Sequence, residues 1–363
     1  MIERGMPSRL RGNRMKLGKI HAAVTAGALL ALTATAQNNT PEQASEPAPT
    51  AAMPTVQPYS IAPAPDPLAT AAAVYATYQS DVTRLEQQRF EDVASIQTAL
   101  NDLGSQNHDQ LSRGWIAYSA LIASQDPEFR AAVRDGEAYY GRDFLVRGLQ
   151  NDVRYARTLH GGSAAVSAAL NAGAADAQRL QATAQTVKQQ AYSLQSYGWA
   201  KGKLGDSGAL ATRLRADSLV GRTASNDMTT AFRAPDIGNV LSTAGRAGAP
   251  SIWRNISGTA DRVRVANVGT ITRGTRRSVA PGSEQVADKI ATLAAYRVLG
   301  SEQTGPAPIQ GAMTESQTSG CMNMANLNLQ QCIAATHQHF EVPFCLGEHA
   351  LAEIGSCIAK VSN

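Results

Sequence analysis

All four cysteines of this chain, Cys321, Cys332, Cys345 and Cys357, lie in its last 43 residues, and the preceding 320 residues contain none. An even number of cysteines in so short a segment predicts disulfides, provided that the chain reaches an oxidising compartment. Apolar residues recur at helical spacing on both sides of Pro343. The segment 321–363 is therefore expected to form a hairpin of two antiparallel helices.

Helix geometry separates the three possible pairings. Cys321 and Cys332 are eleven residues apart, about 16 Å along a helix, which is beyond the reach of a disulfide, and Cys345 and Cys357 fail in the same way. Facing positions of antiparallel helices keep a nearly constant sum of residue numbers. The sums are 678 for Cys321 with Cys357 and 677 for Cys332 with Cys345, whereas the crossed pairing gives 666 and 689. The sequence thus predicts the bonds Cys321–Cys357 and Cys332–Cys345, each worth roughly 3–4 kcal/mol.

The spacing of the last two cysteines leaves a question open. Eleven residues return a helix to nearly the same face, but twelve rotate it by about 120°. Either Cys345 precedes the second helix, or Gly355 loosens the end of that helix. The layout resembles the twin cysteine-pair helical hairpins of the CHCH type, although the spacings differ, and no function is carried over from it. A unit of this size buries too little core to stand alone, which explains why it would need disulfides.

The segment 1–36 has the organisation of a secretory signal peptide. After Met15, the expected true start, come two lysines, an apolar run over 20–32 and the sequence Ala-Thr-Ala. This order predicts cleavage before Gln37 and export to the periplasm or the medium. An uncleaved membrane anchor is the alternative, which the shortness of the apolar run disfavours.

Removing the leader changes the charge of the protein. Residues 1–36 hold six of the 33 basic and one of the 29 acidic residues, which leaves 27 bases and 28 acids, so the formal charge falls from +4 to −1. The basic character of the whole chain therefore belongs to its leader, and nucleic acid is not an expected partner.

The mature chain divides by composition. Residues 37–67 are rich in proline and predict a disordered tether, and 68–200 predict an antiparallel helical bundle. The first helix, 68–103, has an apolar stripe in steps of three and four that is interrupted by a stutter near Arg89. Two interpretations of the stripe stay open, a bundle helix or a dimeric coiled coil, so that oligomerisation through 68–103 is possible. The fold class is all-α, with further helices expected over about 109–124, from Pro127, over 142–159 and over 163–199.

Residues 201–300 are glycine-rich and carry fifteen Lys or Arg against seven Asp or Glu. This segment is expected to be irregular, with a short alternating hairpin over 262–273, and to end in an amphipathic helix over 283–300. A flexible linker, 301–320, would isolate the cysteine hairpin. A basic segment in an exported protein can bind an anionic envelope component, although a solvated connector is the alternative. The candidate partner-binding residues are Arg254, Arg262, Arg264, Arg273, Arg276 and Arg277.

A copper site in the C-terminal hairpin is a second possibility. Thioether and imidazole ligands suit copper, and the candidate ligands are His337, His339, Met322 and Met324. Two histidines two positions apart on a helix point in different directions, and no CxxC or zinc-type spacing occurs. Disulfides are therefore the favoured role of the cysteines, and no cofactor is expected.

The sequence lacks the motifs of the common enzyme classes. No G-x-S-x-G, H-E-x-x-H, P-loop or G-x-G-x-x-G is present. Isolated polar residues on helices are usually solvated or capping, and this applies to Glu137, Asp143, Asp152, His108 and His160. The sequence favours an exported, periplasmic, non-enzymatic structural or interaction protein that binds a protein or an anionic envelope component. The alternatives are a cell-wall hydrolase with a carboxylate pair between bundle helices and a copper-binding protein.

Overall fold

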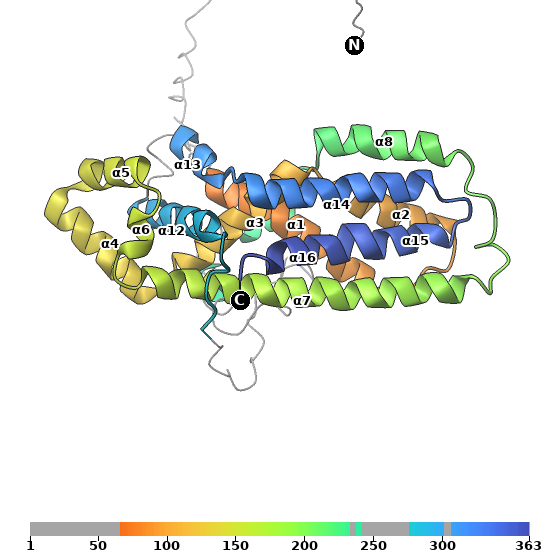
Figure 1. The fold of residues 1–363 in the computed structure, drawn as a ribbon, viewed down its shortest axis with the longest axis horizontal. Coiled ribbons are helices and arrows are strands. Elements are labelled where there is room, and N and C mark those ends of the chain that lie inside the picture. Colours follow the sequence, from red (N-terminus) through yellow and green to blue (C-terminus); the bar gives the residue numbers. More distant parts are fainter. Residues whose placement is uncertain (1–65, 233–236, 242–275, 301–305, 363) are drawn as a thin grey trace, which may run out of the picture. The chain divides into compact units, whose positions relative to one another are not determined.

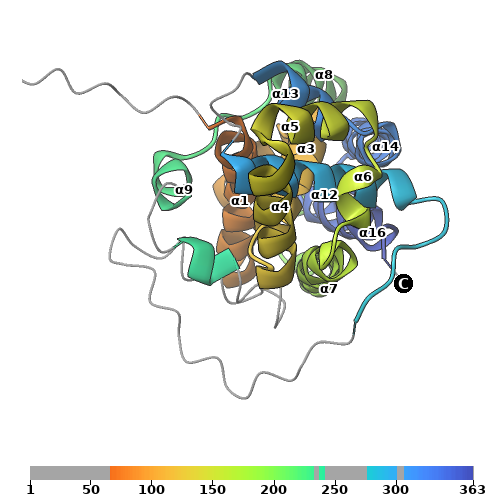
Figure 2. The ribbon, with the colours of Figure 1, turned by 90° about the vertical axis from the view of Figure 1, so that its left-hand side faces the viewer.

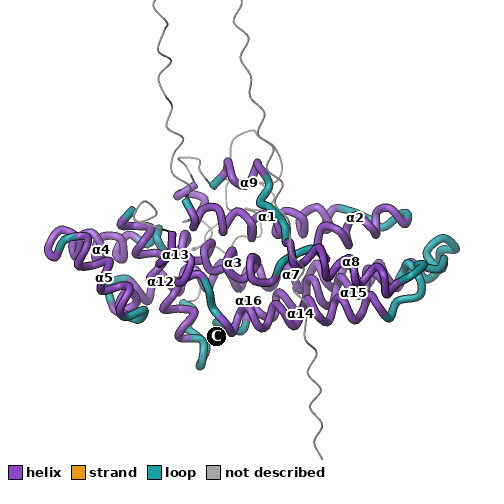
Figure 3. The backbone as a smooth tube through the Cα atoms, turned by 90° about the horizontal axis from the view of Figure 1, so that it is seen from above, coloured by secondary structure: helices purple, strands orange, loops and turns teal. Residues whose placement is uncertain are grey.

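The computed structural model describes residues 66–232, 237–241, 276–300 and 306–362, and these form helices with no strand beyond isolated bridges (Figures 1 and 3). The predicted all-α class is confirmed. None of the described helices is both long and apolar enough to cross a lipid bilayer. The predicted leader, nearly all of the tether and the alternating segment 262–273 lie outside the described residues.

The first predicted helix is two helices, α1 (Pro67–Gln87) and α2 (Val93–Gly104). The carboxylate of Asp66 caps α1 by accepting from the amide of Ala69 at 3.0 Å. The expectation of one continuous helix over 68–103 is wrong, because α2 starts afresh with a capping box in which Asp92 and Ser95 satisfy each other's backbone amides. The stutter near Arg89 thus marks a break.

The stripe of α1 is buried inside this chain. Tyr75, Tyr78, Val82 and Leu85 are at most 3% exposed, and α1 packs along α3 (His108–Ala123). A Cβ atom on Gly114 would lie 2.8 Å from the carbonyl oxygen of Ala71, so glycine permits this close approach. The observed packing is that of the bundle interpretation.

Helices α4 (Pro127–Tyr140), α5 (Arg142–Asn151) and α6 (Tyr155–Thr158) follow at one end of the bundle (Figure 1). The helix predicted over 142–159 is therefore split. Helix α7 (Gly162–Leu194) has 33 residues, about 50 Å of helix, and ends five residues before the predicted Trp199. In the end view, α3 and α12 (Glu284–Leu299) lie inside, with α1, α7 and α14 (Ser316–Ala334) around them (Figure 2).

The basic middle segment is more regular than expected. It contains α8 (Ser207–Val220) and α9 (Asn226–Ala231), so the expectation of an irregular segment is wrong for these residues. The amphipathic helix predicted over 283–300 is confirmed as α12. Its apolar residues are fully buried against the bundle, and they are Val286, Ile290, Leu293 and Leu299.

The region predicted as a flexible linker is largely helical. Helix α13 (Pro306–Met313) precedes α14, whose first turn is capped by the carboxylate of Glu315, which accepts from the amide of Thr318 at 2.6 Å. The expectation of a linker through residue 320 is wrong because Ile309 and Met313 are buried in the common core. The cysteine hairpin is thus not isolated.

The second helix of the hairpin is continuous but changes type along its length. It comprises α15 (Glu341–Cys345), the π-helix η2 (Leu346–Glu353) and α16 (Ile354–Ala359). This helix runs along α7 at close range. A Cβ on Gly355 would lie 3.1 Å from the carbonyl oxygen of Ala177, and one on Gly347 would lie 3.0 Å from that of Ala184. Small residues therefore let the hairpin pack directly onto the bundle.

Candidate functional site

Two disulfides join α14 to the second helix of the hairpin. Cys321 is bonded to Cys357 and Cys332 to Cys345, with Cα atoms 5.7 Å apart in both pairs. This is the pairing that the sums of residue numbers predict. All four cysteines are used, and the bonds are consistent with an oxidising compartment.

The π-helix answers the question raised by the twelve-residue spacing. Cys345 ends α15 within the continuous helix, and Gly355 packs against α7 without ending α16. Neither of the two expected explanations is therefore right. A π-helical turn is closed by i→i+5 hydrogen bonds and holds more residues than an α-helical turn, so each residue rotates the chain less. The widened turns of η2 offset the rotation that would carry Cys357 away from the face of Cys345.

The four alternative copper ligands are not brought together. Met322 is buried in α14, whereas Met324 is exposed on the same helix. His337 and His339 follow the end of α14 at Ala334, twelve residues beyond Met322 and about 18 Å further along the helix axis. Within the described ranges, no three His, Cys, Asp or Glu residues are grouped as a metal site.

Of the six candidate arginines, Arg254, Arg262, Arg264 and Arg273 lie outside the described residues. Arg276 lines a hollow of about 630 Å³ at the start of α7, together with Arg154, Arg157, His160 and Glu128. We call this the basic hollow. Arg277, next along the chain, is half-buried and does not line it. The structure thus brings one candidate arginine to two bundle arginines that the sequence analysis had not singled out.

Ion pairs fix the bundle side of the basic hollow. The Nε of Arg157 donates to Oδ1 of Asp288 on α12 at 2.5 Å, and the Nε of Arg154 donates to Oδ1 of Asp152 at 3.2 Å. Burial raises the pKa of Asp288, and the nearby Arg157 opposes that shift. His160 lies 3.6 Å from Glu128, Nε2 to Oε2. Arg157 is therefore held in place before any ligand arrives, whereas Arg154 and Arg276 are exposed.

A second hollow lies at the break between α1 and α2, where the end of α7 passes. It has a volume of about 700 Å³, and its lining includes Glu86, Gln88, Arg89, Gln190, Tyr197 and Trp199. We call this the break groove. This groove could not be predicted from the sequence, because its residues come from stretches about a hundred positions apart, and the stutter near Arg89 is its one sign there.

A buried polar chain connects the break groove with the core. Arg179 of α7 donates to Glu86 at 2.8 Å, to the side chain of Gln79 at 2.7 Å and to the hydroxyl of Thr83 at 2.6 Å. Gln79 donates to the hydroxyl of Tyr75 at 2.7 Å, and that hydroxyl donates to Asp176 at 3.0 Å. Burial, and then the charge of Asp176, raise the pKa of Tyr75 well above its ordinary value.

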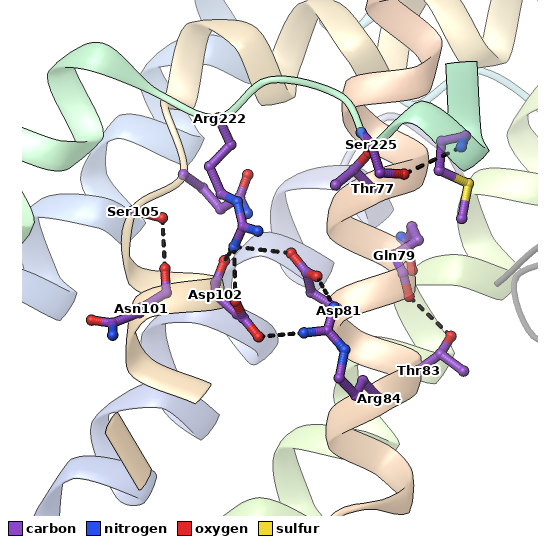
Figure 4. A network of polar contacts seen from close by, with 12 residues as sticks. Thr77, Gln79, Asp81, Thr83, Arg84, Asn101, Asp102, Ser105, Arg222 and Ser225 are labelled. Carbon is purple, nitrogen blue, oxygen red and sulfur yellow. Dashed lines mark hydrogen bonds and ion pairs between the residues drawn. The ribbon is translucent and has the colours of Figure 1, made fainter. Parts of the chain in front are cut away.

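A second network fastens the connection between α8 and α9 to the first two helices (Figure 4). Arg84 pairs with both Asp81 and Asp102, and Nη1 of Arg222 lies 3.2 Å from Oδ2 of Asp81 and 3.2 Å from Oδ1 of Asp102. Burial raises the pKa of Asp81 to about 6, although the charge of Arg222 acts in the opposite direction. This network fixes Arg222 and therefore also the connecting segment that leads into α9.

The isolated polar residues considered in the sequence are exposed or have an ion-pair or hydrogen-bond partner nearby. Glu137 pairs with two arginines of α4 and α5, and Asp152 accepts from the amide of Arg154. Asp143 is exposed on α5, and His108 lies 3.8 Å from Asp109. Asp143 and Asp152 thus match the expected solvated and capping roles, whereas Glu137, with a side chain 22% exposed, takes part in ion pairs.

No known protein family, curated protein or solved structure matches this chain. Two of the hollows in the described part of the chain, the basic hollow and the break groove, combine charged and polar side chains with room for a ligand.

Proposed function

We propose that this chain is an exported, non-enzymatic interaction protein of the bacterial cell envelope, which binds an anionic envelope component through the basic hollow. The observation that carries the proposal is the position of Arg276, which lines the hollow beside Arg154 and Arg157. The arginine-rich segment that begins at Arg254 thus ends next to bundle arginines. The guanidinium groups of Arg276, Arg154 and Arg157 suit a phosphate-bearing or carboxylate-bearing partner, although Glu128 is part of the same lining.

The two alternative functions gain less support. In the break groove, Oε1 of Glu86 accepts from both Arg179 and Thr183. That carboxylate has a structural role, so the groove does not favour a hydrolase with a free pair of acids. The copper-binding alternative is less favoured, because Met322 lies in the first half of α14 and His337 lies beyond the end of that helix. Export is supported by the predicted leader and by the two disulfides.

The experiment is cosedimentation of the mature chain, from Gln37 onward, with vesicles containing phosphatidylglycerol, compared with vesicles of phosphatidylcholine alone. Soluble polyphosphate as a competitor distinguishes recognition of phosphate from recognition of a lipid surface. The test variant replaces Arg154, Arg276 and Arg277 by Ser. A control variant with the same loss of charge replaces Arg130, Arg134 and Arg147, which are exposed on α4 and α5.

The test variant is expected to lose at least about tenfold in affinity and to show a weaker dependence on salt, whereas the control variant keeps its affinity. Equal losses in both variants would contradict a specific site. In cells, the exchange of Arg273, Arg276 and Arg277 for Ser should move the protein from the envelope to the soluble fraction. Unchanged fractionation would contradict the proposal.

A further inference from the structure

We propose that the break groove binds a neutral oligosaccharide, with Trp199 and Tyr197 against the faces of its sugar rings. This site is separate from the basic hollow and does not depend on the proposed function. Its volume of about 700 Å³ lies within the range of small-molecule sites, about 300–1,000 Å³.

The aromatic edge of the groove is held in place by the loop between α14 and α15. Tyr197 is 53% exposed and Trp199 is half-buried, and both belong to the turn that follows α7. The amide of Phe340 donates to the carbonyl of Ala200 at 3.2 Å, and that of His339 donates to the carbonyl of Gly202 at 3.3 Å. The backbone of the turn that carries both rings is therefore positioned without a ligand, which lowers the entropic cost of binding.

The opposite wall is the break between α1 and α2, which side chains of α7 hold open. The side-chain oxygen of Gln190 accepts from the amide of Phe90 at 3.1 Å, and its nitrogen donates to the carbonyl of Gln88 at 3.4 Å. Gln88 is extended, with φ −93° and ψ 139°. Together with the pair between Arg179 and Glu86, these bonds fix the wall before a ligand binds.

The formal charges in and next to the groove balance. Glu86 is matched by Arg179, and the exposed Arg89 is followed two positions later by the exposed Glu91. A groove without net charge offers no advantage to an anion or a cation. The ligand that it favours is therefore uncharged, in contrast to that of the basic hollow.

The other polar side chains of the lining both donate and accept hydrogen bonds. They are amides and hydroxyls, namely Gln87, Gln88, Thr186 and Ser193. A pyranose ring presents hydroxyls around its edge and C–H groups on its faces. Its edge suits the amides, the hydroxyls, Arg89 and Glu91, and its faces suit the rings of Tyr197 and Trp199. This combination of an aromatic edge, mixed donors and acceptors, and balanced charge points to a sugar.

The experiment is isothermal titration calorimetry of the mature protein with three tetrasaccharides. Tetramers of glucose and of N-acetylglucosamine are the neutral probes, and a tetramer of galacturonic acid is the anionic one. Tyr197→Ala and Trp199→Ala remove the rings, and Trp199→Phe keeps a ring in case the alanine variant does not fold. Tyr192→Ala is the matched control, because Tyr192 is 61% exposed on the same end of α7 but does not line the groove.

The expected result is saturable binding of at least one neutral probe with a Kd at or below about 1 mM, and weaker binding of the anionic probe. Tyr197→Ala should weaken binding at least tenfold, Trp199→Phe should weaken it less than Trp199→Ala, and Tyr192→Ala should leave it unchanged. Absence of binding, an unaffected Tyr197→Ala, or an equal effect of Tyr192→Ala would overturn the proposal.

The two hollows can be tested against each other. The variant that lacks Arg154, Arg276 and Arg277 should still bind the neutral sugar, and Tyr197→Ala should still bind anionic vesicles. Failure of one activity with survival of the other therefore shows which proposal is wrong.

Discussion

Arg179 on α7 donates from Nε to Oε1 of Glu86 on α1 at 2.8 Å, from a side chain that is only 5% exposed. The same guanidinium also donates to Gln79 and Thr83, so a single side chain of α7 satisfies three groups of α1. A buried charge with this many partners is costly to remove, because its partners are left unsatisfied. The pair fixes the distance between the two helices at the inner end of the break groove.

Loss of this arginine should destabilise the fold more than loss of the acid. Arg179→Met leaves Gln79 and Thr83 without their donor and should lower the free energy of unfolding by about 3 kcal/mol. Glu86 is 25% exposed, so Glu86→Gln should cost only about 1 kcal/mol. Urea denaturation of both variants measures the difference, and equal costs would contradict the central role of Arg179.

Asp81 should make the fold less stable as the pH rises. Its carboxyl has a pKa of about 6 in the folded protein against 3.8 as the ordinary value. The folded state thus holds this proton more tightly, so the contribution is fully present below about pH 4 and is lost as the pH rises through about 6. At 1.36 kcal/mol per pKa unit, the loss is at most about 3 kcal/mol.

The difference in stability between the wild-type protein and Asp81→Asn isolates this effect, measured by urea denaturation at pH 4, 5, 6 and 7. The free energy of unfolding of the variant should increase relative to that of the wild type as the pH rises. Asp92 is the opposite case, because its hydrogen bonds with Ser95 lower its pKa. Asp92→Asn should therefore be less stable than the wild type at neutral pH and equally stable at low pH.

Two glycines in the hairpin should respond to alanine with opposite signs. At Gly347 a Cβ would meet Cγ of Lys188 at 2.8 Å and the carbonyl oxygen of Ala184 at 3.0 Å, and the backbone cannot move away. Gly347→Ala should cost about 1–3 kcal/mol. Gly320→Ala, in α14 with nothing within 4 Å, should gain about 0.5–1 kcal/mol. Thermal unfolding of the two variants tests the close packing of the hairpin on α7.

The two disulfides should contribute unequally. The bond between Cys321 and Cys357 closes a separation of 36 residues, and that between Cys332 and Cys345 closes 13. The chain-entropy relation gives about 4 and about 3 kcal/mol. Replacing each pair by alanine and measuring denaturant unfolding compares them, and a larger cost for the shorter separation would show that strain or packing outweighs chain entropy.

The sequence predicted those features that local chemistry determines. Asp66 with Pro67 and Asp126 with Pro127 are strong helix starts, and each carboxylate caps its helix. The disulfide pairing followed from helix geometry alone, because two antiparallel helices admit a single register.

The predictions that were wrong concern features that depend on residues far apart in the sequence. The break after α1 is held by Gln190 and Arg179, about a hundred positions later, so the apolar stripe of 68–103 showed it only as a stutter near Arg89. Residues 306–313 resemble a linker in composition, yet Ile309 and Met313 find room in a core built by other helices. The two hollows combine residues from separate parts of the chain, which no spacing rule connects.

The π-helix Leu346–Glu353 can also be regarded as an insertion. Cys321 and Cys332 are eleven positions apart, and Cys345 and Cys357 are twelve. Between the two disulfides, the second helix of the hairpin therefore has one residue more than α14. In a helix without cross-links, the widened turn that holds an extra residue can shift along the helix and disappear at a frayed end. Here the disulfides clamp both flanks of the widened turn. The surplus residue is therefore trapped, and its removal by a one-residue deletion should leave both bridges closed around an ordinary α-helix.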